Sequence, residues 1–273
     1  MELISDGYSL SSLAMTAKLR KLLRLLPPLV AREIRERYTD SVLGTAWTLI
    51  QPAVFILLYW MVFSRILRVG GTPDAPFIVF LLSGLLPWFA FQEGLAQGAA
   101  AIVAKRQVIK KVMFPSELFP LVSVSAAGIV HGTGFLLFLA GFFLWKGEVK
   151  VLQAAALVAL FAWQWLLTAG LALFLASLAV YLRDILQLLS LALQALFYTT
   201  TVLYPLAAVP NDLRPLLFIN PFTPLAESYH RLVLYGQYPE PDHVLYLLVA
   251  APALFALGAF LFRKLKPGFA DVL

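Results

Sequence analysis

The chain has 273 residues, of which 61% are hydrophobic and only 13% are charged, and its mean hydropathy is +0.84. A soluble globular domain carries roughly 45–50% apolar and about 25% charged residues, so this composition excludes a soluble enzyme, a disordered chain and a small secreted module, and it predicts a membrane protein. The sequence contains no cysteine, which rules out disulfides, thiolate metal sites and cysteine nucleophiles.

Residues 28–44 are predicted to form an amphipathic helix that lies in the membrane interface ahead of the first span. Arg32 with Glu36, and Glu33 with Arg37, are opposite charges four residues apart on one helix. An apolar row recurs every four residues beside them: Val30, Ile34, Tyr38 and Val42. An arginine-rich face next to such a row is typical of an interfacial helix. The alternative is a solvated helix that only sets the topology.

Charged residues divide the remaining chain into six apolar stretches. Since a helix needs roughly 20 apolar residues to cross a bilayer, each stretch predicts one membrane span. The spans are expected near 46–64, 75–92, 118–145, 153–181, 185–205 and 243–262. The chain is thus predicted to be a single all-α transmembrane domain over 1–273.

The Lys and Arg residues predict the orientation of these spans. The segments on the side of the N-terminus hold 15 of the 21 basic residues, and the segments on the other side hold 6. Because basic residues collect on the cytoplasmic side, both termini are expected to be cytoplasmic. This distribution explains the net charge of +6 without a nucleic-acid partner.

The cytoplasmic segment 93–117 is mildly apolar and then strongly basic, at Lys105, Arg106, Lys110 and Lys111. A basic helical loop of this kind either holds the topology or docks a soluble partner, and the residues alone leave both readings open.

The outer segment 206–242 is interrupted by prolines, at Pro210, Pro215, Pro221, Pro224, Pro239 and Pro241, so no single helix can cross it. Apolar runs such as 216–219 lie between these prolines. Short helices that dip into the outer leaflet would bury the runs and satisfy their own backbone groups. The alternative is an ordinary exposed loop.

Catalytic chemistry has little support in the sequence. His131 is essentially the one ionisable group expected at bilayer depth, and a hydrogen bond between helices is favoured over a functional role for it. Gly128 and Gly132 form a small-residue pair that lets helix backbones approach closely. Glu227 and His230 lie one turn apart, but a third metal ligand is missing, so neither a metal site nor a catalytic site is predicted.

Aromatic residues are frequent in the spans. Many of them suit the belts that aromatic side chains form at the lipid interface. Flat aromatic rings also offer contact surfaces for sugar rings, so a role in glycan binding stays open at this point.

Several short motifs resemble the ABC-2 type permeases that export polysaccharides. Residues 35–52 read RERYTDSVLGTAWTLIQP and resemble the entry signature of that family. Further motifs follow in the family's order: FLLSGLLPWF at 80–89, KKVMFP at 110–115, YLRD at 181–184 and NPFTP at 220–224. The resemblance extends from about residue 25 to residue 265, most of the chain.

The resemblance implies a transport subunit rather than an enzyme. Such permeases form homodimers and bind two copies of a separate ATP-binding cassette subunit, which carries the ATP and Mg. This chain has no phosphate-binding loop of its own and needs no cofactor. The implied substrate is a lipid-linked polysaccharide, such as an O-antigen, exported across the bacterial inner membrane.

Three groups of site residues follow from the resemblance and the patterns above. Coupling to the ATPase is assigned to Arg32, Arg35, Arg37, Lys105, Arg106, Lys110, Lys111, Arg183 and Asp184. The substrate channel is assigned to Tyr59, Trp60, Phe197, Tyr198 and Tyr204. Short gate helices between the fifth and sixth spans are assigned Leu216, Phe218, Asn220, Pro221, Glu227 and His230.

Two alternatives remain from the sequence. One is an ABC-2 permease for a drug or a small lipid, which needs only a closed pocket instead of a long channel. The other, from a different class, is a membrane-embedded acyltransferase that modifies glycans, for which Glu227 and His230 are the available catalytic groups.

Overall fold

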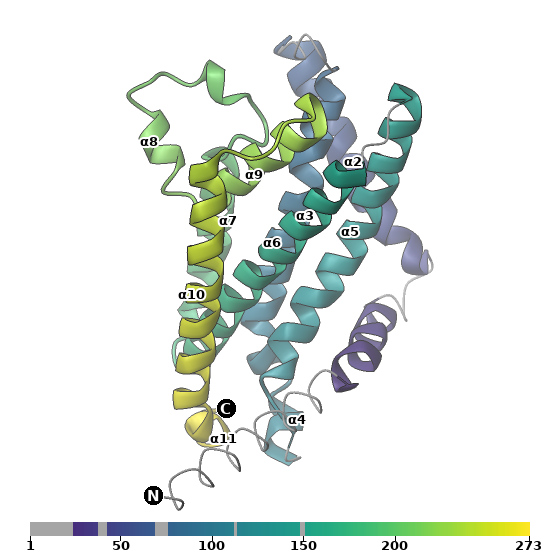
Figure 1. Cartoon of the computed structure of the whole chain (residues 1–273). Coiled ribbons are helices and arrows are strands. Elements are labelled where there is room, and N and C mark those ends of the chain that lie inside the picture. Colours follow the sequence, from purple (N-terminus) through teal and green to yellow (C-terminus); the bar gives the residue numbers. More distant parts are fainter. Residues whose placement is uncertain (1–23, 38–42, 69–75, 112–113, 148–150) are drawn as a thin grey trace, which may run out of the picture.

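The computed structural model describes residues 24–37, 43–68, 76–111, 114–147 and 151–273, and every regular element in these ranges is a helix (Figure 1). The predicted all-α fold is therefore confirmed. Long helices stand side by side as a bundle, and short helices cover its two ends.

Four helices are long and apolar enough to cross a membrane: α3 (Phe77–Ala104), α5 (Leu118–Lys146), α6 (Val151–Ala179) and α10 (Pro241–Leu265). Two further apolar helical stretches are shorter. The first, Ile50–Ile66, lies in α2 (Trp47–Trp60) and the π-helical turn η2 (Met61–Ile66), and the second is α7 (Asp184–Tyr198). Of the six predicted spans, four are thus helices of spanning length within the described residues, and the first and fifth are shorter.

Within the described residues the N-terminal helix occupies 24–36, so it includes residues before the predicted start at 28 and ends before the predicted end at 44. Tyr38 and Val42 of the predicted apolar row lie outside the described residues. The chain enters α2 through the 3₁₀ turn η1 (Gly44–Ala46). Gly44 has φ +50°, a left-handed conformation that glycine adopts at little cost, so this turn depends on its missing side chain.

Helix α3 continues through Glu93 to Ala104, whereas the sequence predicted a span that ends at residue 92 and a cytoplasmic segment after it. Residues 93–104 therefore continue the helix of the second predicted span. Gly94 and Gly98 lie in this part of α3, and their missing side chains let α3 lie close to Thr168 and Ala172 of α6. Buried side chains along α3, including Leu81, Leu85, Trp88 and Phe91, place it at the centre of the bundle, against α5, α6 and α9 (Thr223–His230).

The glycine pair of α5 has a different neighbour from the one predicted. Gly128 and Gly132 lie against the ring of Phe161 on α6, so they accommodate an aromatic side chain and not a second helix backbone. Direct backbone contact occurs elsewhere, between Gly170 of α6 and Gly258 of α10.

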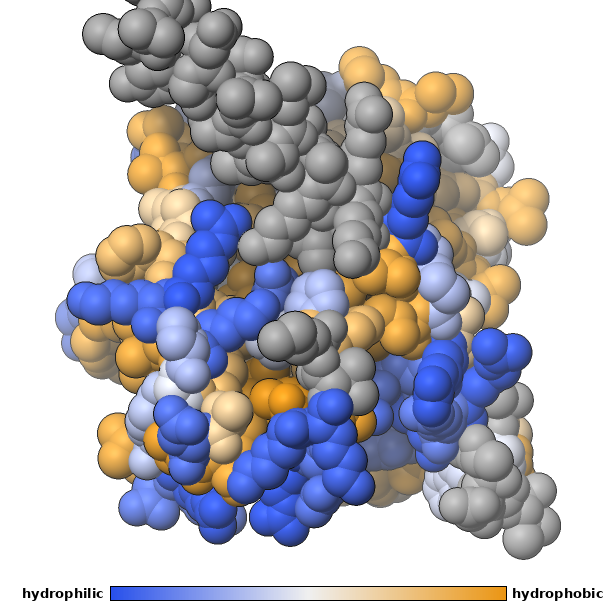
Figure 2. Space-filling view, turned by 90° about the horizontal axis from the view of Figure 1, so that it is seen from below, coloured by the Kyte–Doolittle hydropathy of each residue, from blue (hydrophilic) through white to orange (hydrophobic). Residues whose placement is uncertain are grey.

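The two ends of the bundle differ. Helices α4 (Arg106–Lys111) and α11 (Phe269–Val272) lie at one end, and α8 (Arg214–Leu217) and α9 lie at the other (Figure 1). Seen from the α4 end, hydrophilic side chains gather over the lower half of the face, with hydrophobic ones between them and along the upper edges (Figure 2). This distribution is the one expected for a helical bundle that presents a polar end to water.

Candidate functional site

The N-terminal helix packs its apolar row against α5. Val30 is buried with Val122 and Ala126, and Leu26, Leu29 and Ile34 pack around them. On the opposite face, Arg32 Nε donates a hydrogen bond to Glu36 Oε1 at 2.6 Å, as predicted. This hydrogen bond lowers the pKa of the Glu36 carboxyl. Arg35 Nε donates a hydrogen bond to the backbone carbonyl of Ala31 on the same helix at 3.3 Å.

The predicted pair of Glu33 with Arg37 is replaced by contacts to α3. Glu33 Oε2 lies 3.6 Å from Lys105 Nζ, and Glu36 Oε2 lies 3.9 Å from the same atom. Arg37 instead donates through Nη1 to the carboxylate of Glu93. The charges of the N-terminal helix thus join it to α3 at two positions.

Glu93 was not identified from the sequence, and its carboxylate joins α3 to two other helices. Its other oxygen, Oε2, accepts a hydrogen bond from His131 Nε2 of α5 at 2.6 Å, and Gln97 Nε2 donates to Oε1 at 3.1 Å. His131 therefore makes the hydrogen bond between helices that was favoured for it. Glu93 was read as the end of a span because it is charged, and only its distant partners Arg37 and His131 explain its position inside α3.

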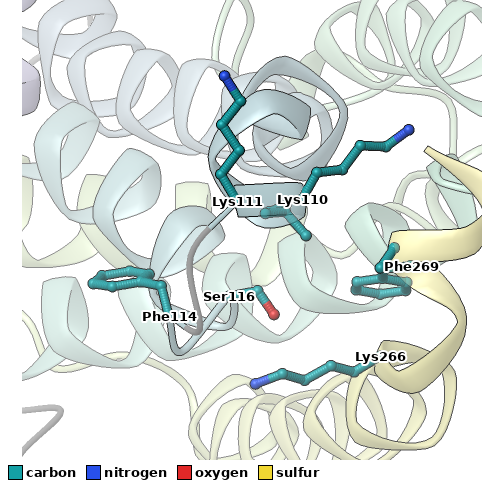
Figure 3. Close-up of a pocket in the computed structure, with 8 residues that line it drawn as sticks. Lys110, Lys111, Phe114, Ser116, Lys266 and Phe269 are labelled. Atoms are coloured by element: carbon teal, nitrogen blue, oxygen red, sulfur yellow. The ribbon is translucent and has the colours of Figure 1, made fainter.

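The basic residues of the α4 end line a small pocket of about 280 Å³. Figure 3 shows the Ser116 hydroxyl pointing into the space between the rings of Phe114 and Phe269, and the ammonium groups of Lys110 and Lys111 extending away from it. Within the described residues, the buried Ser116 Oγ has no hydrogen-bond partner. Lys266 Nζ, also at this pocket, pairs with Glu117 Oε2 at 2.5 Å.

The remaining coupling candidates lie on exposed surface. Arg106 is exposed on α4, and Arg183 and Asp184 are exposed at the turn between α6 and α7. The structure thus separates the nine predicted coupling residues: Arg37 is largely buried against Glu93, whereas Arg106, Lys110, Lys111, Arg183 and Asp184 are open to a partner.

Four of the five predicted channel aromatics form one connected group. The Tyr59 ring of α2 lies 5.5 Å from the Phe197 ring of α7, which in turn contacts Tyr198 at 5.5 Å. Tyr204 donates its hydroxyl proton to the carbonyl of Tyr198 at 2.7 Å. Trp60 is not part of this group. Instead, the guanidinium of Arg65 lies over the Trp60 ring, 5.4 Å from its centre, in a cation–π contact.

The members of this aromatic group differ in how exposed their side chains are to solvent. Phe197 is buried and packs on Trp88 of α3 at 5.4 Å, so it holds its neighbours in place. Tyr198 is 63% exposed and is the group's accessible ring. Tyr59 and Tyr204 are half-buried beside it.

Asn220 fixes the outer segment to the end of α7. Its Nδ2 donates to the carbonyl of Leu196 at 2.7 Å, and its Oδ1 accepts from the backbone N–H of Phe222 at 3.0 Å. The first bond satisfies one of the carbonyls that a helix end leaves unpaired. Helix α7 therefore stops at Tyr198, seven residues short of the predicted end at 205, and Pro221 follows in the turn to α9.

His230 fixes α9 to α3. Its Nε2 donates to the carbonyl of Thr201 at 3.0 Å, its Nδ1 lies 2.9 Å from Ser83 Oγ, and its ring stacks on Phe80 at 4.2 Å. Both ring nitrogens of His230 are thus engaged by residues of other elements, which ties α9 to α3 and to the segment after α7. Gly84 makes room for the ring, since a Cβ there would lie 3.0 Å from His230 Cε1.

The apolar run at 216–219 is only partly covered by the chain itself. Leu217 is buried, whereas Leu216, Phe218 and Ile219 are exposed on or beside α8. These side chains form an apolar surface at the end of the bundle that is opposite to α4.

Comparisons with known proteins agree with the sequence motifs. Residues 26–234 match the family described as "ABC-2 type transporter". The chain is 27% identical over 264 residues to the O-antigen export system permease protein RfbA of Klebsiella pneumoniae, with 96% of this chain and 100% of that protein covered. It is 29% identical to the RfbA protein of Myxococcus xanthus, covering 90% and 94%, and 24% identical to the polysialic acid transport protein KpsM of Escherichia coli, covering 86% and 91%.

Proposed function

The chain belongs to the ABC-2 type transporter family, and from this premise we propose that it is the membrane permease subunit of an exporter for a lipid-linked polysaccharide of the O-antigen type. The observation that carries the proposal is the alignment with an O-antigen export permease over that protein's entire length. The polysialic acid transport protein among the relatives supports the same substrate class, since its name gives a polysaccharide as what it transports.

We propose six crossings of the bacterial inner membrane, with both termini in the cytoplasm. The first crossing is Ile50–Ile66, the fifth is α7, and the four long helices supply the others. Their alternating direction between the two ends of the bundle and the excess of Lys and Arg on the α4 side support this assignment (Figure 1).

The α4 end is proposed to receive a separate ATP-binding subunit, which holds the ATP and Mg. The exposed cations Arg106, Lys110, Lys111 and Arg183 give this end a positive surface, and the pocket beside α4 offers a recess for a partner side chain. A positive surface steers association with an acidic partner and fixes its register.

A homodimer is proposed to enclose the glycan path. Apolar side chains of α2 and α7 are exposed in the single chain, at Val54, Leu57, Leu58, Leu188 and Leu191. Tyr59 and Phe197 hold α2 and α7 together, so these exposed faces and the ring of Tyr198 belong to neighbouring parts of one surface. A second copy placed there would form a path with aromatic rings along its wall, and the apolar surface around α8 would form its outer gate.

The test is reconstitution of the chain with the ATP-binding subunit of its own transporter in vesicles that contain a lipid-linked glycan. We expect the glycan to cross only when ATP is hydrolysed. Transport of the lipid carrier or of a small drug in place of the glycan would overturn the substrate assignment and favour the small-molecule permease. Equal transport with a hydrolysis-deficient ATP-binding subunit would overturn the assignment as an ATP-driven permease.

A further inference from the structure

We propose that Arg37, Glu93 and His131 form a joint that transmits movement of the N-terminal helix to the spans α3 and α5. The inference rests on the proposed function, because it assigns these residues a part in coupling ATP hydrolysis to export. They are positioning residues and do not contact the glycan.

The joint connects three separate elements through one carboxylate. Glu93 of α3 accepts hydrogen bonds from Arg37, at the end of the N-terminal helix, and from His131 of α5 at 2.6 Å. Gln97, one turn further along α3, donates to the same carboxylate at 3.1 Å and holds its orientation. Hydrogen bonds to an ionised carboxylate are about twice as strong as those between neutral groups, so these contacts hold the three elements together.

Burial makes the joint costly to open. The side chain of Arg37 is 12% exposed and that of Glu93 is 29% exposed, so separating them would leave charges unpaired in a poorly solvated position. The pair between Arg32 and Glu36 differs, because it is exposed and lies within one helix. The Arg37–Glu93 pair, in contrast, carries a charge contact from the N-terminal helix to a largely buried position on α3.

A second attachment keeps the N-terminal helix from pivoting about this joint. Lys105, at the end of α3, lies 3.6 Å from Glu33 and 3.9 Å from Glu36. Positions 93 and 105 are separated by about 18 Å along a helix axis, at 1.5 Å per residue. The helix also buries Val30 against α5, so a push on it has to move α3 and α5 together.

The joint lies next to the proposed glycan surface. The His131 ring is 5.9 Å from Phe89, and Phe89 is 6.3 Å from Phe55 of α2. Phe55 stacks on Tyr59, a member of the aromatic group. A displacement of α3 at the joint thus reaches the α2–α7 surface through rings in direct contact.

The experiment compares Glu93→Gln and Arg37→Gln with wild type as full complexes with the ATP-binding subunit in vesicles. For each variant we would measure the amount of assembled complex, the rate of ATP hydrolysis and the glycan exported per ATP. We expect assembly and hydrolysis within about twofold of wild type, and a loss of about tenfold in export per ATP, since the charged contact that links the elements is gone. Glu93→Asp, which keeps the charge, should recover part of the lost export.

Asp212→Asn is the control, because it removes an exposed carboxylate at the opposite end of the bundle. Unchanged export per ATP in both variants, in complexes whose wild type exports glycan, would overturn the joint alone. Absence of export in the wild type would overturn the proposed function instead. If Glu93→Gln fails to accumulate, Arg37→Gln decides, because it leaves the Glu93 carboxylate with its partners His131 and Gln97.

Discussion

Gly170 and Gly258 bring helices α6 and α10 into direct backbone contact. A Cβ atom added at Gly258 would overlap the carbonyl oxygen of Gly170, and one added at Gly170 would lie 2.5 Å from the backbone nitrogen of Phe255. Backbone atoms cannot yield as a flexible side chain does. The α6–α10 contact therefore depends on both glycines.

Gly258→Ala should lower the stability of the protein by about 1–3 kcal/mol, because overpacking at a closed contact forces the two helices apart. Thermal unfolding in detergent measures the effect. Gly141→Ala is the matched control, since a Cβ at Gly141 has no neighbour within 4 Å and alanine favours the helix. A Gly258→Ala protein as stable as the control would contradict the close contact.

Reversal of Arg106, Lys110 and Lys111 to Glu should reduce binding of the ATP-binding subunit by about tenfold or more, because the steering charge of the α4 end changes sign. Co-purification of the two subunits and stimulated ATP hydrolysis measure this. Lys146→Glu reverses a lysine at the other end and should bind as wild type does. Full binding by the triple variant would remove the α4 end from the docking surface.

The same reversal could invert the orientation of the chain, because these cations also help to hold it. A single cysteine at Asp212 reports the orientation through a thiol reagent that does not cross the membrane. The loss of binding counts for docking only where the outer cysteine stays accessible.

Tyr198→Ala should lower glycan export about two- to tenfold while ATP hydrolysis stays unchanged, since a ring contact contributes about 0.5–1.5 kcal/mol. Tyr204→Ala should act in the same direction, because Tyr204 positions Tyr198 through its hydrogen bond. Tyr198→Phe keeps the ring and should export normally. Normal export by both alanine variants would show that these rings do not contact the glycan and would favour a position at the lipid interface instead.

The sequence predicted most accurately those helices that have a charged residue at each end. The helix of the third predicted span was expected at 118–145 and occupies Leu118–Lys146, because Glu117 and Lys146 stand at its ends. In α3, by contrast, the charged residue does not mark the end of the helix. Glu93 carries a charge but lies within the helix, and its partners come from residues 56 positions before it and 38 after it. Such a satisfied charge cannot be distinguished from an exposed one by local pattern.

Tertiary packing also determines which of the predicted site residues are buried and which contacts they make. The basic residues were identified from the sequence, yet burial separates Arg37 from the exposed Lys110 and Lys111. Asn220 was named as a gate residue, and the structure shows that it pins α7 to the outer segment. Likewise, neither Gly170 nor Gly258 belongs to a small-residue pair of its own helix, so their contact follows only from the crossing of α6 and α10.

The outer segment supplies the last prediction, which concerns where its apolar side chains lie. Leu216 is 59% exposed and Ile219 is 76% exposed in the chain, whereas Leu217 is buried. If α8 lies in the outer leaflet, lipid covers Leu216 and Ile219, because short helices satisfy their own backbone groups there. If the segment is a solvated loop, water reaches both side chains.

Single cysteines at Leu216 and Ile219 should therefore resist a thiol reagent that does not cross the membrane, while cysteines at the exposed Asp212 and Glu240 react rapidly. The chain has no cysteine of its own, so every signal comes from the introduced residue. A cysteine at Leu217 should resist in either arrangement, because the protein itself covers it. Rapid labelling at 216 and 219 together with protection at 217 would place α8 in water and remove it as an outer gate.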